Sequence, residues 1–243
     1  MTTLLAAGAV VAGAALQSAT GFGFSLLAAP LLFVLLGPAQ AVGLLILLAL
    51  EVNLLTLGTE RRRPRPLLRD TAVLLTWALP GALAGVVVLR ALDAVWLQVA
   101  LSVTVLATLA ARRRSVHGSR GRGAPLAGLA AGALTTSTSA AGPPLLIHLL
   151  GRGHAPGEVR DTLTLCFIGL SPIGAAALSA TGTSDAMPGL GLAAALVPAV
   201  LAGHLVGRRG FARLARGDSY EPILTAILLV SVAAGLAGAI ASA

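Results

Sequence analysis

Long apolar stretches alternate with short polar connections along almost the whole chain. A helix of about 20 apolar residues crosses the hydrocarbon core of a bilayer. Six stretches approach that length: residues 39–58, 71–89, 94–111, 162–181, 188–207 and 222–242. The pattern predicts an all-α polytopic membrane protein.

Two further apolar stretches, residues 4–36 and 125–150, are each interrupted near the middle by a polar segment that contains glycine. The first interruption is QSATGFG at 17–23, and the second is TTSTSAAGPP at 135–144. A broken helix inside a bilayer is tolerated only where protein or a water-filled cavity satisfies its backbone groups. Paired breaks in two halves of a chain indicate the binding site of a transporter.

The two breaks belong to an internal repeat. An offset of 119 residues places Ser137 on Ser18 and Gly142 on Gly23. At an offset of 118, the pattern Pro-x-x-Leu-Ala-Gly at 198–203 matches residues 80–85. We expect one integral membrane domain over residues 1–243. Its parts are a first repeat at about 4–111, a cytoplasmic linker at 112–123 and a second repeat at about 124–242.

Composition agrees with a membrane protein, because 56% of the residues are hydrophobic and only 11% are charged. Soluble domains carry about 25% charged residues. The net charge of +8 comes from arginines that fall mostly between spans, and aromatics are only 3%, so we expect no nucleic-acid partner. A single cysteine, Cys166, gives neither a disulfide framework nor a thiol metal cluster, and we expect no metal or cofactor.

Arginine placement predicts the topology, because short cytoplasmic loops are enriched in basic residues. Segments 60–69, 112–123 and 208–216 are rich in arginine, whereas 91–93 and 182–187 contain none. If each broken stretch were an ordinary crossing, segment 208–216 would lie outside. If each is a hairpin of two short half-helices, every arginine-rich loop lies inside. We therefore expect two inverted-topology repeats, each a broken-helix hairpin plus three transmembrane helices, with about eight membrane elements in all.

The breaks are candidate anion sites, because a helix that begins in mid-membrane directs unpaired N–H groups and its positive dipole end toward the bilayer centre. Hydroxyls can donate hydrogen bonds there, and glycine allows close approach to the backbone. The candidate substrate-binding residues are Gln17, Ser18, Thr20, Gly21 and Gly23 in the first break, and Ser137, Thr138, Ser139, Gly142 and Pro143 in the second. Small residues in membrane helices also serve close packing, which is the alternative interpretation.

Three ionisable residues within the apolar stretches are candidates for coupling or gating, because burying a charge in a membrane is costly. Glu51 is either a proton-coupling carboxylate or close enough to the cytoplasmic end to reach water. His204 is matched by Val86 in the repeat, and is either a neutral, satisfied histidine or a proton relay. His148 lies near the end of the second half-helix, and is either part of a gate or at a solvated interface.

Around the breaks the chain resembles the TauE/SafE family of sulfite exporters and related organosulfur-anion permeases. The segment AGAALQSATGFGF at 12–24 with APLL at 29–32 looks like the opening segment of that family. GPPL at 142–145 and RDTL at 160–163 resemble its counterpart in the second half, although Ala140 and Ala141 stand where the family is often richer in glycine. The resemblance spans essentially the whole chain, and implies a bacterial inner-membrane permease for sulfite, sulfonates and similar anions.

The leading hypothesis is therefore a secondary transporter of small anions, with lipid around it, driven either by a proton or sodium gradient or by the gradient of the substrate itself. An anion channel has the same sequence features. An intramembrane serine hydrolase, pairing Ser137 or Ser139 with His148 or His204, remains a further alternative.

The inverted topology can be tested by cysteine accessibility. In a Cys166→Ala background, we expect Ser184→Cys to react with an impermeant maleimide added outside intact cells, because segment 182–187 joins two spans on the outer side. Reaction only after the cytoplasmic side is exposed would contradict the inverted arrangement.

Overall fold

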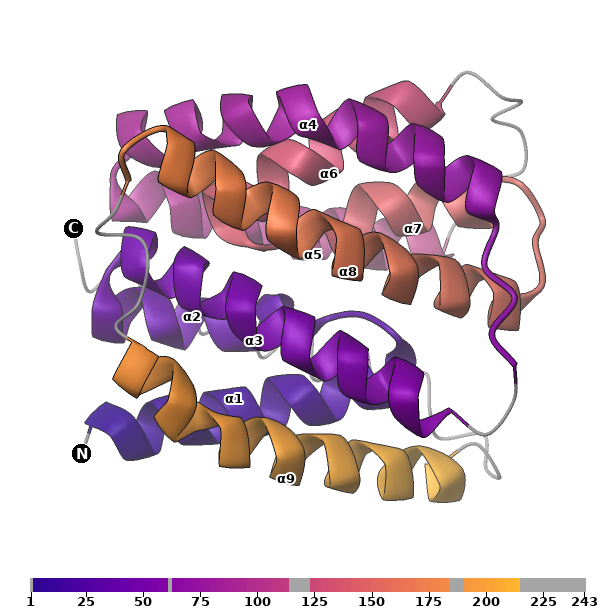
Figure 1. Ribbon diagram of the computed structural model, residues 1–243, viewed down its shortest axis with the longest axis horizontal. Coiled ribbons are helices and arrows are strands. Elements are labelled where there is room, and N and C mark those ends of the chain that lie inside the picture. The colour runs from indigo at the N-terminus through magenta and orange to yellow at the C-terminus, as the bar shows by residue number, and fades with distance from the viewer. Residues whose placement is uncertain (1, 61–62, 114–122, 184–189, 215–243) are drawn as a thin grey trace.

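The computed structural model describes residues 2–60, 63–113, 123–183 and 190–214, and within these ranges all regular structure is helical. Figure 1 shows the helices lying side by side along one common direction. The helices are α1 (Thr2–Thr20), α2 (Phe24–Leu36), α3 (Pro38–Thr59), α4 (Leu68–Ala91), α5 (Ala94–Arg113), α6 (Ala124–Thr138), α7 (Gly142–Leu150), α8 (Pro156–Ala180) and α9 (Leu190–Leu214).

Five helices, α1, α3, α4, α8 and α9, are long and apolar enough to cross a membrane. Large apolar side chains on α4 face outward, among them Leu79, Leu83 and Val87, which are 53%, 52% and 66% exposed. Such a surface is costly in water and suited to lipid. The protein is thus an α-helical, multi-pass membrane protein. The predicted span at 222–242 and residue Ser184 lie outside the described residues.

Both predicted interruptions coincide with breaks between helices. The chain turns between α1 and α2 at Gly21 and Gly23, which have φ of +85° and +106°. Between α6 and α7 it turns at Ser139, with φ of +59°. Left-handed backbone is easy for glycine and uncommon for other residues. At 19 residues α1 is longer than the short half-helix expected, and it is one of the five candidate spans.

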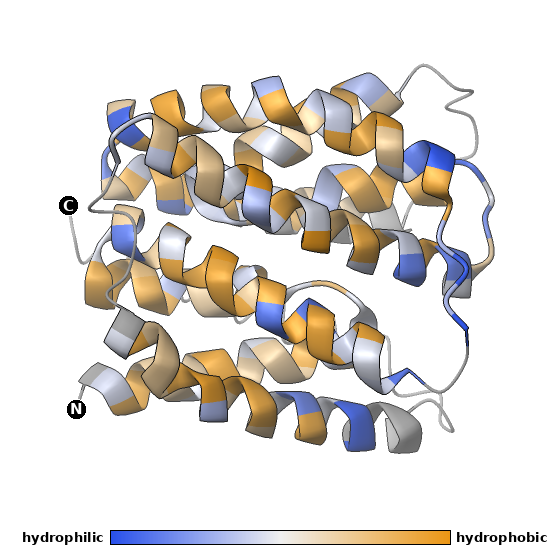
Figure 2. Cartoon of the chain, viewed as in Figure 1, coloured by the Kyte–Doolittle hydropathy of each residue, from blue (hydrophilic) through white to orange (hydrophobic). Residues whose placement is uncertain are grey.

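The two hairpins open at opposite ends of the molecule. In Figure 1 the α1–α2 hairpin opens at the end where the N-terminus lies, and the α6–α7 hairpin opens at the other end. The α3–α4 connection, the start of α8 and the end of α9 also lie at that second end, which is the more hydrophilic one in Figure 2. We call it the arginine-rich end, because it includes segments 63–69, 152–160 and 208–213.

The halves interlock through two close helix pairs, α4 with α6 and α1 with α9. A Cβ added at Gly81 or Gly85 would lie 2.1 Å from a carbonyl oxygen of α6, and one at Gly132 would lie 2.1 Å from the Ala78 oxygen. At the second pair, a Cβ at Gly207 would lie 2.2 Å from the Ala15 oxygen. Glycines spaced by four residues allow such close backbone contact in membranes.

A substitution at the α4–α6 contact should lower stability. We expect Gly132→Ala to cost about 1–3 kcal/mol, because the added methyl group overlaps a backbone carbonyl that cannot move away like a side chain. The apparent melting temperature in detergent measures the loss. Gly8→Ala is the matched control, because nothing lies within 4 Å of its added Cβ. Equal melting temperatures for the two variants would contradict the contact.

Candidate functional site

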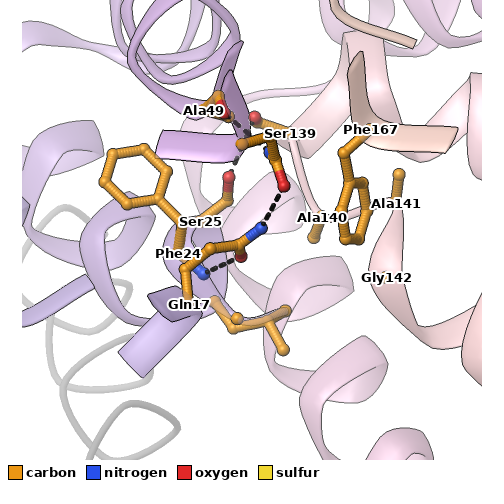
Figure 3. Close-up of a pocket in the computed structure, with 12 residues that line it drawn as sticks. Gln17, Phe24, Ser25, Ala49, Ser139, Ala140, Ala141, Gly142 and Phe167 are labelled. Carbon is orange, nitrogen blue, oxygen red and sulfur yellow. Dashed lines mark hydrogen bonds between the residues drawn. The ribbon is translucent and has the colours of Figure 1, made fainter. Parts of the chain in front are cut away.

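The two breaks meet at one pocket. The hydroxyl oxygens of Ser25 and Ser139 lie 3.0 Å apart, and Figure 3 shows these side chains pointing toward one another. The pocket has about 320 Å³ of empty volume, including its opening. It is lined by Gln17, Gly23, Phe24, Ser25, Leu26, Ala49, Asn53, Ser139, Ala140, Ala141, Gly142 and Phe167. Residues more than a hundred positions apart in the sequence therefore form one small cavity.

Gln17 organises the first break. Its Nε2 donates to Asn53 Oδ1 at 2.9 Å, and its Oε1 accepts from the Phe24 amide at 3.0 Å. Asn53 in turn donates to the Ala49 carbonyl at 2.7 Å. Gln17 and Asn53 are only 3% and 1% exposed, so unmade bonds there would be costly. One amide side chain thus joins α1 and α3 and holds the first turn of α2 (Figure 3).

The starts of two half-helices face the pocket: α2 through its N-cap Gly23 and residues 24–26, and α7 through Gly142 and the preceding residues 139–141. The first amides of a helix have no partner within it, and its dipole favours negative charge at that end. Pro143 fits near the start of α7, where a missing N–H costs little. None of the pocket residues is ionisable. The pocket can therefore attract a small anion by amides, hydroxyls and dipoles without a charged side chain.

Four of the residues predicted to bind substrate line this pocket: Gln17, Gly23, Ser139 and Gly142. Pro143 is buried in the first turn of α7 and is not among the lining residues.

The remaining predicted hydroxyls mostly bond to their own backbone. Thr20 donates to the Leu16 carbonyl at 3.0 Å and accepts from the Phe22 amide at 3.2 Å. In α6, the hydroxyls of Ser137 and Thr138 donate to carbonyls one turn earlier, at 2.7 and 3.2 Å. Bonds from a Ser or Thr hydroxyl to a carbonyl one turn back often bend a helix.

Sequence reasoning missed Ser25, Asn53 and Phe167 as pocket residues. Asn53 carried a signal, because a buried amide within a span needs partners and Gln17 is the polar residue with which the first break begins. Ser25 lies two residues after Gly23, where the first break ends. Phe167 is an apolar residue in an apolar helix, and nothing in its pattern distinguishes it from a core residue.

Arg160 lies behind the first break, toward the arginine-rich end. Its guanidinium is 3.2 Å from the Glu60 carboxylate and donates to the Ser18 carbonyl at 3.3 Å. A Cβ at Gly21 would lie 2.7 Å from its Cγ, so only glycine leaves room for this side chain. Positive charge at the carbonyl end of α1 is favourable. Arg160 also borders a second, smaller pocket with Glu60 and Asp161.

The three coupling or gating candidates occupy different places. Glu51 is half-buried in α3. His148 is buried in α7, and neither of its ring nitrogens has a hydrogen-bond partner in the described structure. His204, which is 3% exposed, lies between the hydroxyls of Ser18 and Thr59. Among the described residues, no group of three or more His, Cys, Asp and Glu side chains could hold a metal.

The family model described as "Sulfite exporter TauE/SafE" matches residues 5–236, nearly the whole chain. No curated protein matches the chain, and no solved structure does.

Removing the Gln17 amide should loosen the first break. We expect Gln17→Ala to lower stability by about 1–3 kcal/mol, because Asn53 and the Phe24 amide are left without their partner. Hydrogen exchange at the Phe24 amide should speed up by a corresponding factor. Thr138→Val is the control, because its hydroxyl bonds only within α6. Unchanged exchange at Phe24 in Gln17→Ala would contradict this role of Gln17.

Proposed function

Since this chain belongs to the sulfite exporter TauE/SafE family, we propose that it is a secondary transporter that moves small anions such as sulfite or organosulfonates. We place it in the bacterial inner membrane, with lipid and the transported anion as its partners. The observation that carries the proposal is the pocket into which two half-helices direct their first turns, from opposite halves of the chain.

The pocket suits a compact oxyanion. The Ser25 and Ser139 hydroxyls lie together there, and Gly142 supplies the one N–H among the first three residues of α7, because Pro143 and Pro144 carry none. The low polarity around these donors strengthens each hydrogen bond. Because no arginine lines the pocket, the anion is not held too tightly to leave. Phe24 and Phe167 add apolar walls against which the carbon chain of a sulfonate can pack.

Alternating access would arise from two inverted repeats, about 4–111 and 124–242, within a single membrane domain. Each would contain a broken hairpin and three crossing helices, about eight elements in all. Two observations support this proposal: the hairpins open at opposite ends, and the halves exchange equivalent contacts, α4 with α6 and α9 with α1. Rocking of one half against the other would then expose the pocket to each side in turn.

The serine hydrolase alternative has less support, and we infer that the protein is not an enzyme. Ser137 donates to the Ala133 carbonyl and Ser139 pairs with Ser25, whereas a nucleophile needs a base within hydrogen-bond reach. The serine that does contact a histidine is Ser18, which is 2% exposed and does not line the pocket.

A transport panel tests the proposed function. Proteoliposomes should show saturable exchange of labelled sulfite or sulfonates, and weaker exchange of sulfate or carboxylates. Flux that rises linearly with concentration, and that never runs uphill, would indicate an anion channel instead. Hydrolysis of a membrane substrate, lost in Ser139→Ala, would indicate the enzyme.

Filling the pocket should block transport in proportion to side-chain size. A Cβ at Gly142 would lie 3.5 Å from Phe22 Cδ2, which is ordinary contact, so Gly142→Ala should keep most activity. Gly142→Leu should lower exchange at least about tenfold, the equivalent of roughly 1.4 kcal/mol. Gly8→Leu is the matched control on an open face of α1. Full activity of Gly142→Leu would contradict the assignment of the pocket.

A further inference from the structure

A chain of three polar side chains, of which Ser18 and His204 are buried and Thr59 is half-buried, runs from the first break toward the arginine-rich end. His204 Nδ1 lies 2.8 Å from the Ser18 hydroxyl, and His204 Nε2 lies 3.0 Å from the Thr59 hydroxyl. Ser18 adjoins the pocket residue Gln17 in sequence, and Thr59 is the last residue of α3. The chain thus links the turn beside the pocket to the end of the molecule where arginines gather.

The hydrogen bonds define which nitrogen carries the proton. Thr59 has one hydroxyl proton, and it donates this to the Leu55 carbonyl at 2.6 Å. The Thr59 oxygen must therefore accept from His204 Nε2–H. With that proton on Nε2, a neutral imidazole has Nδ1 as an acceptor, and Ser18 donates to it. His204 therefore has a basic lone pair, on Nδ1, that is aimed at the first break.

The repeat contains a serine equivalent to Ser18, and the position equivalent to His204 is not a histidine. The offset of 119 places Ser137 on Ser18, and Val86 occupies the position that matches His204. Ser137 donates to the Ala133 carbonyl, one turn back in its own helix. Ser18 has an equivalent carbonyl at Ala14. If Nδ1 gains a proton and becomes a donor, Ser18 can turn its hydroxyl to Ala14 and accept from the imidazolium.

Close helix packing holds His204 against the first break. Gly203 and Gly207 flank it on α9, and an added Cβ would lie 2.4 Å from the Val11 oxygen and 2.2 Å from the Ala15 oxygen of α1. The same α1–α9 contact therefore sets the distance between imidazole and serine.

The charged groups around His204 are few. Within α1 no side chain is ionisable, and within α3 only Glu51 is, two turns before Thr59. Arg208 lies one turn after His204 on α9, and Arg160 of α8 is also close to the imidazole. The Glu60 carboxylate, at the end of α3, pairs with Arg160. A proton on His204 would add positive charge at a point next to the first break, and an anion in the pocket would offset that charge.

We propose that His204 is the proton-binding group of the transport cycle, taking one proton on Nδ1 when an anion occupies the pocket and releasing it when the anion leaves. This inference rests on the proposed transport function. One proton and one anion then move in the same direction, and the Ser18 hydroxyl is the switch between the two states. Glu51 and His148 lack a comparable chain of hydrogen bonds to the break in the described structure.

The test separates exchange from proton-driven accumulation. Proteoliposomes take up labelled isethionate, a sulfonate that stays ionised, so that pH acts on the protein and not on the substrate. With the membrane potential clamped, a gradient of two pH units should drive about 100-fold accumulation at one proton per anion. In His204→Gln we expect exchange of labelled for unlabelled isethionate to persist and accumulation to fall to the equilibrium level. His154→Gln is the matched control and should accumulate like the wild type.

Two transport results would overturn the inference: accumulation by His204→Gln equal to the wild type, or wild-type exchange without any response to the pH gradient. Absence of exchange for every anion would instead overturn the proposed function. Nitrogen NMR of histidine-labelled protein then decides on the proton site by itself. A neutral His204 with its proton on Nε2, which gains a second proton on acidification, supports the inference. A proton on Nδ1 in the neutral form, or no titration, overturns it.

Discussion

Every backbone amide and carbonyl inside a bilayer needs a partner, and the two broken helices are where this constraint shapes the molecule. At the first break, the Gln17 side chain binds the Phe24 amide and Asn53, and Arg160 binds the Ser18 carbonyl. These residues come from different helices, so the break can exist only when the helices around it are in place. In the function proposed above, groups at the helix starts would hold the anion.

Close packing by glycine complements this polar network. The pairs α4–α6 and α1–α9 bring backbones into contact across the two halves, so each hairpin is held by a helix of the other half. The pocket therefore lies between parts that are tightly joined at their flanks. In the proposed movement, the helices would slide along these glycine contacts, because pulling them apart would lose the close backbone packing.

Much of the fold could be predicted from the sequence, because a span and a break are local patterns. Helix α2 begins at Phe24 and ends at Leu36 as its sequence predicted. The pocket was harder to predict. Hydroxyls such as those of Thr20 and Thr138 bond to nearby backbone, whereas Ser25 and Asn53 bond to residues far away in the sequence. Proximity of His204 to Ser18 depends on helix packing over 186 residues, which no local pattern encodes.

The contact between α1 and α9 also bears on how the protein is made. Chains emerge from the ribosome N-terminus first, so α1 is made before α9. Its main partner, α9, follows only after both hairpins and most of the other helices have been synthesised. Until then, Ser18 lacks its partner His204, whereas Gln17 already has Asn53 of α3 and the Phe24 amide. The contact that joins α1 to α9 can therefore form only after most of the described helices have been made.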